Sequence, residues 1–190
     1  LIGIYGKSGS GKSTFVNLLT RLIKPSSGQI FIDDVEIENL NDARKYQNFF
    51  NITSQDTFLL NGTIKDNIVF GSQSKISTKT LDDAIKFARL EEMLAELPNG
   101  IETDTGLTFK KLSSGQKQRI TIARSIYLDR EILIFDEATN ALDEENEKII
   151  IENICKLKLK KTIIIISHNL ENLSKCDVIY SLKKGKLIKN

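Results

Sequence analysis

The chain has 190 residues, 40% of them apolar, which is enough to bury one sizeable core or two small ones. Its 27 Lys and Arg residues nearly balance its 25 Asp and Glu residues. The net charge of +2 gives no electrostatic reason to expect a nucleic-acid partner. Two cysteines in no metal-binding spacing exclude a disulfide framework, and the longest aliphatic run, Ile163–Ile166, is too short to cross a bilayer.

Short apolar strands dominate the first part of the chain. Residues 1–5 are predicted to form a buried strand, and a helix at about 12–23 follows a Gly/Ser-rich loop. The segment 25–28 predicts a turn into a strand at 29–33, and residues 49–54 predict a third strand. Because the chain begins without Met inside its first predicted strand, we expect it to be part of a longer polypeptide.

From residue 56 to about 115 the pattern becomes helical. One helix is predicted at 63–69. A second helix is predicted to begin at Ser77 and to have Leu81, Ile85 and Ala88 on one face. Helices at 114–128 and 144–158 then alternate with strands at 131–136 and 162–167. Such alternation is typical of a mainly parallel sheet covered by helices on both faces. The sequence therefore predicts one α/β domain, 1–190, with a core of residues 1–55 and 116–190 and an inserted α-helical subdomain at about 56–115.

A glycine-rich loop lies between the first predicted strand and the first predicted helix. Its residues 6–13, GKSGSGKS, match the phosphate-binding motif G-x-x-x-x-G-K-[ST] of P-loop NTPases. Glycines let the backbone approach phosphates, while Lys12 would reach the β- and γ-phosphates and Ser13 would bind Mg²⁺. The alternative is an ordinary flexible loop with a chance lysine. The expected nucleotide-binding residues are Gly6, Lys7, Ser8, Gly9, Ser10, Gly11, Lys12, Ser13 and Thr14.

Two carboxylates, Asp136 and Glu137, end the apolar strand at 131–136. Ligands of parallel sheets bind at the carboxyl ends of the strands, so we expect Asp136 to bind Mg²⁺ and Glu137 to act as general base on water. The alternative is a strand that runs into a solvated acidic turn. Further upstream, Ser113 and Gln116 have the spacing of a helix capping box, which is compatible with anion binding at the same helix N-terminus.

Taken in order, these motifs make the chain resemble the nucleotide-binding domain of ABC transporters over essentially its whole length. The family's phosphate loop matches residues 6–13, its glutamine loop matches Gln55, and its L-S-G-G-Q signature matches 112–116. Its aspartate–glutamate strand matches 136–137, its A-x-x-A-L-D loop matches 138–143, and its switch histidine matches His168.

The resemblance implies roles for further residues and partners. Glu137, His168 and Gln55 would be catalytic, and Ser13, Gln55 and Asp136 would bind Mg²⁺. The ATP would be sandwiched between the phosphate loop of one chain and the signature of a second ABC ATPase domain, identical or homologous. The signature residues that would contact this ATP are Ser113, Ser114, Gly115 and Gln116.

Residues 54–68, SQDTFLLNGTIKDNI, resemble the exporter and flippase branch, in which this domain is fused to a transmembrane domain upstream on the same polypeptide. That resemblance implies a location at the cytoplasmic face of a membrane. We expect the N-terminal β-strands of the family, with their adenine-stacking aromatic residue, to be missing from these 190 residues.

The chain departs from the family pattern at four positions. Ser114 replaces the second glycine of the signature, and Asn140 stands where serine is common. Leu107 and Phe109 replace a glutamate and a glycine that are usual before the signature in exporters. Serine is small, so we expect the change at Ser114 to be tolerated.

Three functional hypotheses remain at this point. The first is the ATPase domain of an ABC exporter or flippase. The second is a soluble ABC-type ATPase of DNA repair or translation, which predicts long coiled-coil insertions, tandem cassettes or basic tracts. The third is a P-loop kinase, which leaves the signature and His168 unexplained.

Overall fold

A computed structural model describes residues 1–40, 42–72, 77–108 and 112–190. Within them, a six-stranded sheet has the order β4-β5-β6-β1-β7-β8. Its strands are β1 (Ile2–Tyr5), β4 (Phe50–Ser54), β5 (Ile132–Asp136), β6 (Thr162–Ser167), β7 (Val178–Lys183) and β8 (Lys186–Lys189). All neighbours in this order pair in parallel except β7 and β8, so the predicted mainly parallel sheet is confirmed.

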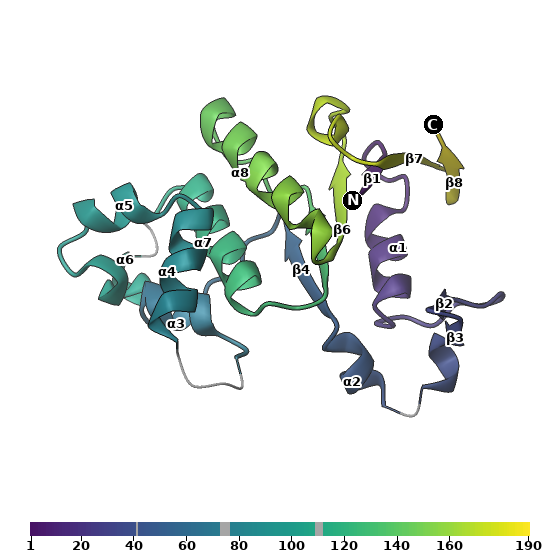
Figure 1. Ribbon diagram of the computed structural model, residues 1–190, viewed down its shortest axis with the longest axis horizontal. Coiled ribbons are helices and arrows are strands. Elements are labelled where there is room, and N and C mark those ends of the chain that lie inside the picture. Colours follow the sequence, from purple (N-terminus) through teal and green to yellow (C-terminus); the bar gives the residue numbers. More distant parts are fainter. Residues whose placement is uncertain (41, 73–76, 109–111) are drawn as a thin grey trace.

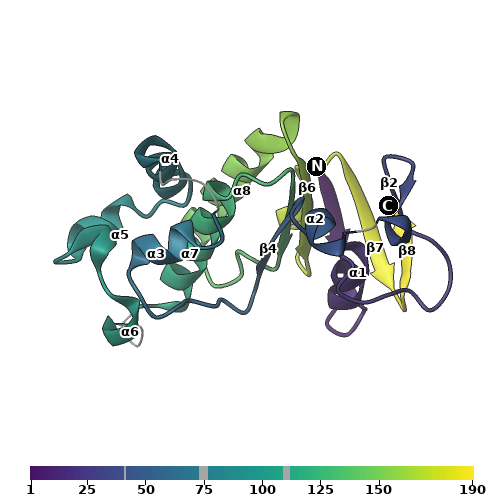
Figure 2. The same cartoon turned by 90° about the horizontal axis from the view of Figure 1, so that it is seen from below.

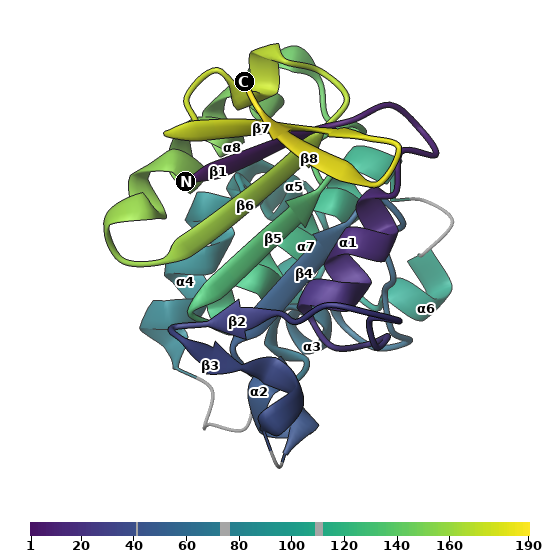
Figure 3. The ribbon, with the colours of Figure 1, turned by 90° about the vertical axis from the view of Figure 1, so that its right-hand side faces the viewer.

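Helices cover both faces of this sheet, as predicted (Figure 3). Because successive strand residues point to opposite faces, Leu133 and Phe135 of β5 face one side and Ile134 faces the other. The first side packs against α7 (Ser114–Tyr127) and α8 (Glu144–Lys156), and the second packs against α1 (Lys12–Leu19). The continuous aliphatic strands of the sequence are therefore buried on both faces.

The helical part of the chain lies to one side of the sheet (Figures 1 and 2). It contains α3 (Ile64–Val69), α4 (Thr78–Phe87), α5 (Glu91–Glu96), the 3₁₀ turn η2 (Gly100–Glu102) and α6 (Thr105–Thr108). Of these helices, α3 and α4 pack against α7. Side chains cap α3 and α4 at Thr63 and Ser77, as the sequence predicts for Ser77. One apolar cluster connects these helices to the sheet, and the subdomain boundaries at 56 and 115 stay a prediction.

Several elements differ from the sequence prediction. Helix α1 ends at Leu19 rather than near residue 23, since Arg21 adopts a left-handed backbone conformation with φ 57°. The predicted strand at 29–33 is reduced to β2 (Phe31–Ile32), which pairs with β3 (Val35–Glu36) through a turn at Asp33 and Asp34 and is not part of the main sheet.

Other described elements were absent from the prediction. They are β3, β7, β8, the helix α2 (Ala43–Gln47) and the 3₁₀ turns η1 (Ile37–Asn39), η3 (Leu157–Leu159) and η4 (Glu171–Leu173). Both termini lie at the sheet, away from α3–α6 (Figures 1 and 2). In the part of the chain that the structure describes, no helix combines the length and hydrophobicity needed to span a bilayer.

Candidate functional site

The phosphate loop connects the carboxyl end of β1 to the first turn of α1. Gly9 and Gly11 adopt φ angles of 76° and 101°, which favour glycine. A Cβ atom at Gly6 would lie 2.5 Å from Oγ of Ser10 and 3.3 Å from the carbonyl oxygen of Leu182, so a side chain there would displace Ser10. No side chain caps α1 at Gly11. Its first backbone N–H groups therefore remain available for an anion.

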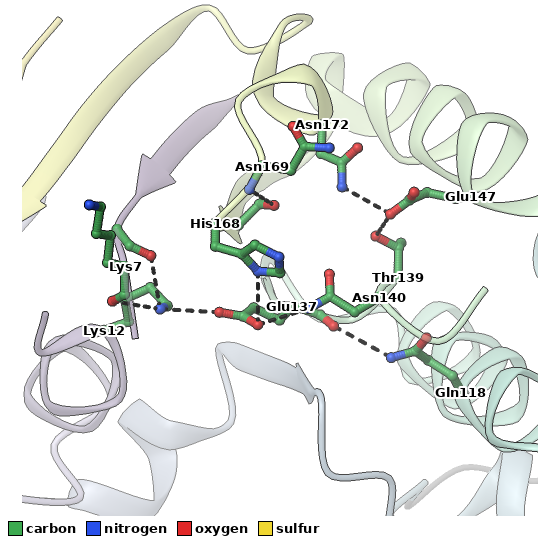
Figure 4. A network of polar contacts seen from close by, with 12 residues as sticks. Lys7, Lys12, Gln118, Glu137, Thr139, Asn140, Glu147, His168, Asn169 and Asn172 are labelled. Atoms are coloured by element: carbon green, nitrogen blue, oxygen red, sulfur yellow. Dashed lines mark hydrogen bonds and ion pairs between the residues drawn. The ribbon is translucent and has the colours of Figure 1, made fainter. Parts of the chain in front are cut away.

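Lys12 directs its side chain back across this loop. Its Nζ atom donates to the carbonyl oxygens of Gly6 at 3.0 Å and Lys7 at 3.2 Å, and it lies 3.1 Å from Oε1 of Glu137. Only 9% of the residue is exposed. The ammonium group thus connects the end of β1 to the end of β5, which are two strands apart in the sheet (Figure 4).

Glu137 follows β5 with a left-handed backbone, φ 52°, which is uncommon for a residue with a side chain. Its N–H donates to the carbonyl of Ile166 at 3.0 Å, and this bond extends the pairing of β5 with β6 by one residue. Its Oε2 atom accepts from Nδ2 of Asn140 at 2.8 Å and lies 3.3 Å from Nδ1 of His168. The carboxylate is therefore held between Lys12, Asn140 and His168 (Figure 4).

The two adjacent carboxylates have opposite pKa shifts. Burial raises the pKa of Asp136, and the negative charge of Glu137 adds to this effect, whereas Lys12 opposes it. For Glu137, burial is the largest effect and acts to raise the pKa, but the hydrogen bonds and charges of Lys12 and His168 together outweigh it. The pKa of Glu137 is therefore lowered, and this carboxylate is ionised at neutral pH.

A cavity of about 960 Å³ lies at this edge of the sheet and brings most of the predicted site residues together. Asp136, Glu137, His168 and Gln55 line it opposite the phosphate loop, and Tyr5, Ser54 and Asp56 complete its wall. The phosphate-loop residues that line it are Lys7, Ser8, Gly9, Gly11, Lys12, Ser13 and Thr14. Gly6 and Ser10 lie in the same loop.

The predicted signature residues lie elsewhere. Among the described residues that line the cavity, none belongs to 113–116. Ser113 and Gln116 form the predicted capping box of α7, with hydrogen bonds of 3.1 and 2.9 Å between each backbone N–H and the other's side chain. Ser114 is exposed, and Phe109 lies outside the described residues. A Cβ atom at Gly115 would lie 2.8 Å from the carbonyl oxygen of Ala141, so the signature packs directly against the loop after Glu137.

Sequence reasoning missed two polar residues that support this loop. Gln118 of α7 is fully buried, accepts from the N–H of Ala141 at 3.0 Å and approaches the carbonyl oxygen of Glu137 at 3.5 Å. Asn140 donates to Glu137. A polar residue between the apolar positions of a helix was the available signal for Gln118, and the replacement of the family's common serine was the signal for Asn140.

Comparison with known proteins identifies the family of this chain. The family model described as ABC transporter matches residues 1–140. The chain belongs to this family. It is 39% identical over 187 residues to the ATP-dependent lipid A-core flippase of Pseudoalteromonas atlantica, with 97% of the chain aligned to 32% of that protein. It is 38% identical over 187 residues to the heterocyst differentiation ATP-binding protein HepA of a Nostoc species, with 97% of the chain aligned to 30% of that protein.

A solved structure of a bacterial Atm1-family ABC exporter with ATP bound shares the fold of this chain. The TM-score is 0.92 at 37% identity, and the match covers 98% of this chain and 33% of the exporter. The chain thus spans about a third of the length of the curated relatives named above. As a member of this family, the chain is an ATP-binding ABC domain.

Proposed function

We propose that this chain is the ATP-hydrolysing motor domain of an ABC exporter or flippase and drives transport across a membrane through ATP-dependent dimerisation. The observation that carries the proposal is the convergence of Lys12, Glu137 and His168 on one cavity beside the phosphate loop. A cation that can bind phosphate, an ionised carboxylate that can accept a proton from water and an imidazole beside that carboxylate suit γ-phosphate hydrolysis.

The residues of this site fit ATP with Mg²⁺. The uncapped start of α1 offers backbone donors to phosphate oxygens, and Oγ of Ser10 is buried without a hydrogen-bond partner among the described residues. The hydroxyl of Ser13, the carboxylate of Asp136 and the amide oxygen of Gln55 are the hard oxygen ligands that Mg²⁺ prefers. When bound there, Mg²⁺ would neutralise charge on the phosphates.

Each protein group then has a distinct task. Lys12 moves its charge from Glu137 to the nucleotide phosphates, and this exchange releases the Glu137 carboxylate to accept a proton from the attacking water. His168 holds the opposite oxygen of that carboxylate and orients it. The phosphate loop positions the γ-phosphate in line with this water.

The signature supports a requirement for a second chain. Since residues 113–116 lie outside the cavity that contains Lys12, they are free to bind a nucleotide held by another ABC domain. The relatives are about three times as long as this chain, which supports fusion to an upstream transmembrane domain at the cytoplasmic face of a membrane. Relatives named as a flippase and an exporter favour transport over a soluble repair or translation ATPase, and family membership disfavours a kinase.

The test is phosphate release by the intact protein in lipid vesicles. We expect Mg²⁺-dependent ATP hydrolysis that Glu137→Gln lowers by about 10²- to 10⁴-fold, the usual range for a positioned general base. Glu131→Gln, an exposed carboxylate at the opposite end of β5, is the matched control. Wild-type turnover in Glu137→Gln would exclude Glu137 from catalysis, and wild-type protein without hydrolysis would overturn the function.

A further inference from the structure

The loops that follow β5 and β6 contact one another at two places. At the cavity, Oε2 of Glu137 lies 3.3 Å from Nδ1 of His168. Farther from the cavity, the carboxylate of Glu147 lies between Thr139 of the first loop and Asn172 of η4, which follows the second loop (Figure 4). The second contact has no role in the function proposed above.

The outer contact is a bridge through a single oxygen atom. Oγ1 of Thr139 donates to Oε1 of Glu147 at 2.7 Å, and Nδ2 of Asn172 donates to the same oxygen at 2.9 Å. Thr139 is 8% exposed, and Glu147 and Asn172 are half-buried. Two short hydrogen bonds to one partly buried carboxylate oxygen are stronger than bonds between neutral groups.

All three elements joined by this bridge have residues in the main apolar cluster, including Ala138 of the loop 138–143. Ile150 and Ile154 of α8 are buried in the main apolar cluster, and Leu173, next to Asn172, is fully buried in it. A cavity of about 480 Å³ lies between α8 and η4, with Glu147 and Asn172 in its wall, so polar contacts rather than close apolar packing connect these elements here. The bridge therefore adds a polar connection between the loop 138–143 and the other two elements.

A simpler explanation is that Glu147 only favours the N-terminal turn of α8, where acidic residues interact well with the helix dipole. Glu144 and Glu145 lie in the same turn and are exposed, so the dipole already has acidic partners. In the described structure, Glu147 is the acid of this turn whose carboxylate accepts hydrogen bonds from both neighbouring loops. The dipole does not explain that orientation.

We infer that Glu147 is a positioning residue for ATP hydrolysis. Its bridge fixes the loop 138–143 relative to the loop after β6, and the separation of these loops sets the contact between Glu137 and His168 at the cavity. Glu147 acts through Thr139 and Asn172. This inference rests on the proposed function, because it assigns Glu147 an effect on the reaction that Glu137 performs.

Three variants of the intact protein in lipid vesicles test the inference. In Glu147→Ala both bonds are lost, and we expect kcat to fall by about 10-fold or more with little change in KM for ATP, since misplaced reacting groups slow the chemical step. Glu147→Gln keeps a carbonyl oxygen that accepts both bonds and should retain kcat within about 3-fold. Glu144→Ala removes an acid from the same turn and should leave kcat unchanged.

A fourth variant, Thr139→Val, removes one donor at almost constant volume. It should lower kcat, and adding it to Glu147→Ala should cause no further loss, because both changes break the same bridge. Wild-type kcat in Glu147→Ala, an equal loss in Glu147→Gln, or multiplied losses in the double variant would overturn the inference. Hydrolysis by wild-type protein and its loss in Glu137→Gln are measured alongside, so failure of the proposed function is recognised separately.

Discussion

Nζ of Lys12 lies 3.1 Å from Oε1 of Glu137, although 125 positions separate the two residues in the chain. The pair is mostly buried, with 10% and 15% of the two side chains exposed. Removing either partner would leave a charge that water compensates only in part. The phosphate loop and the end of β5 are therefore electrostatically coupled, and a change in one alters the other.

Lys12→Ala should weaken ATP binding by about 10- to 100-fold or more, because charge-assisted bonds to phosphate contribute about 1.5–3 kcal/mol each. It should also reduce turnover beyond the loss of binding, since the Lys12 ammonium would no longer stabilise the charge that develops on the phosphates in the transition state. Fluorescent-nucleotide titration and phosphate release measure the two effects. The control is Lys24→Ala, which changes an exposed lysine beyond the other end of α1. Unchanged ATP affinity in Lys12→Ala would contradict the role assigned to Lys12.

The sequence predicted the parts of the fold that local patterns determine. Strands β1, β5 and β6 are short runs dominated by buried aliphatic residues, and β4 is a short segment with aromatic and β-branched residues. The phosphate loop is a contiguous motif between a strand and a helix. Strand β7 was missed because only Ser181 and Leu182 of it are buried, and β8 because it is exposed throughout. Lys184 and Gly185, which form the turn between β7 and β8, adopt a left-handed backbone. The glycine at this position was the available sequence signal for the hairpin.

The contacts within the site were beyond sequence reasoning for a different reason. Motif spacing indicated that Glu137, His168 and Lys12 share one edge of the sheet, but a single sequence does not reveal which side chains pair. The bond from Asn140 to Glu137 and the bridge at Glu147 depend on the left-handed backbone at Glu137 and on the packing of α7 against the following loop. These are tertiary features.

Signature residues should act on the nucleotide of the partner chain. Combining a Lys12→Ala chain with a Ser113→Ala chain creates one composite site with both defects and one with neither. We expect the mixed dimer to hydrolyse ATP faster than either mutant homodimer, as measured by phosphate release from the intact protein. If it is no faster, the face-to-face arrangement is wrong and Ser113 serves its own chain's nucleotide.

Gly115→Ala should destabilise the contact between the signature and the loop 138–143. Its Cβ atom would lie 2.8 Å from the carbonyl oxygen of Ala141, and backbone on both sides leaves little room for adjustment. We expect a loss of about 1–3 kcal/mol, as for other overpacked sites, together with slower ATP hydrolysis. Thermal unfolding measures the loss of stability. Ser114→Ala is the control, because it also places an alanine at the start of α7 but at an exposed position. Equal melting temperatures for Gly115→Ala and wild type would show that the contact is dispensable.

Asp136→Asn should impair Mg²⁺ retention and therefore both ATP binding and turnover. Asp136 lines the cavity with Ser13 and Gln55, and its carboxylate is the charged ligand of this predicted set. ATP titration at several Mg²⁺ concentrations should show a higher Mg²⁺ requirement in the variant, and excess Mg²⁺ should restore part of the activity. An unchanged Mg²⁺ requirement would remove Asp136 from the metal site.

Glu137→Gln should separate binding from hydrolysis in a way that Asp136→Asn does not. The amide keeps the size of the side chain and its contacts with Asn140 and His168, but it does not accept a proton from water. Ground-state binding of ATP should therefore survive while the transition state is no longer stabilised.

If ATP joins two chains until it is cleaved, the Glu137→Gln variant should accumulate as an ATP-dependent dimer of ABC domains. Transmembrane domains would keep the two chains together with or without nucleotide, so the oligomeric state does not report closure of the ABC domains. Closure is instead measured in the intact protein by cross-linking two introduced cysteines, one at exposed Ser114 and one at Ser8 of the opposite phosphate loop. Mg-ATP should increase this cross-link strongly in Glu137→Gln and only transiently in wild type. Cross-linking that does not depend on ATP, or that is equally weak in both proteins, would contradict closure driven by unhydrolysed ATP.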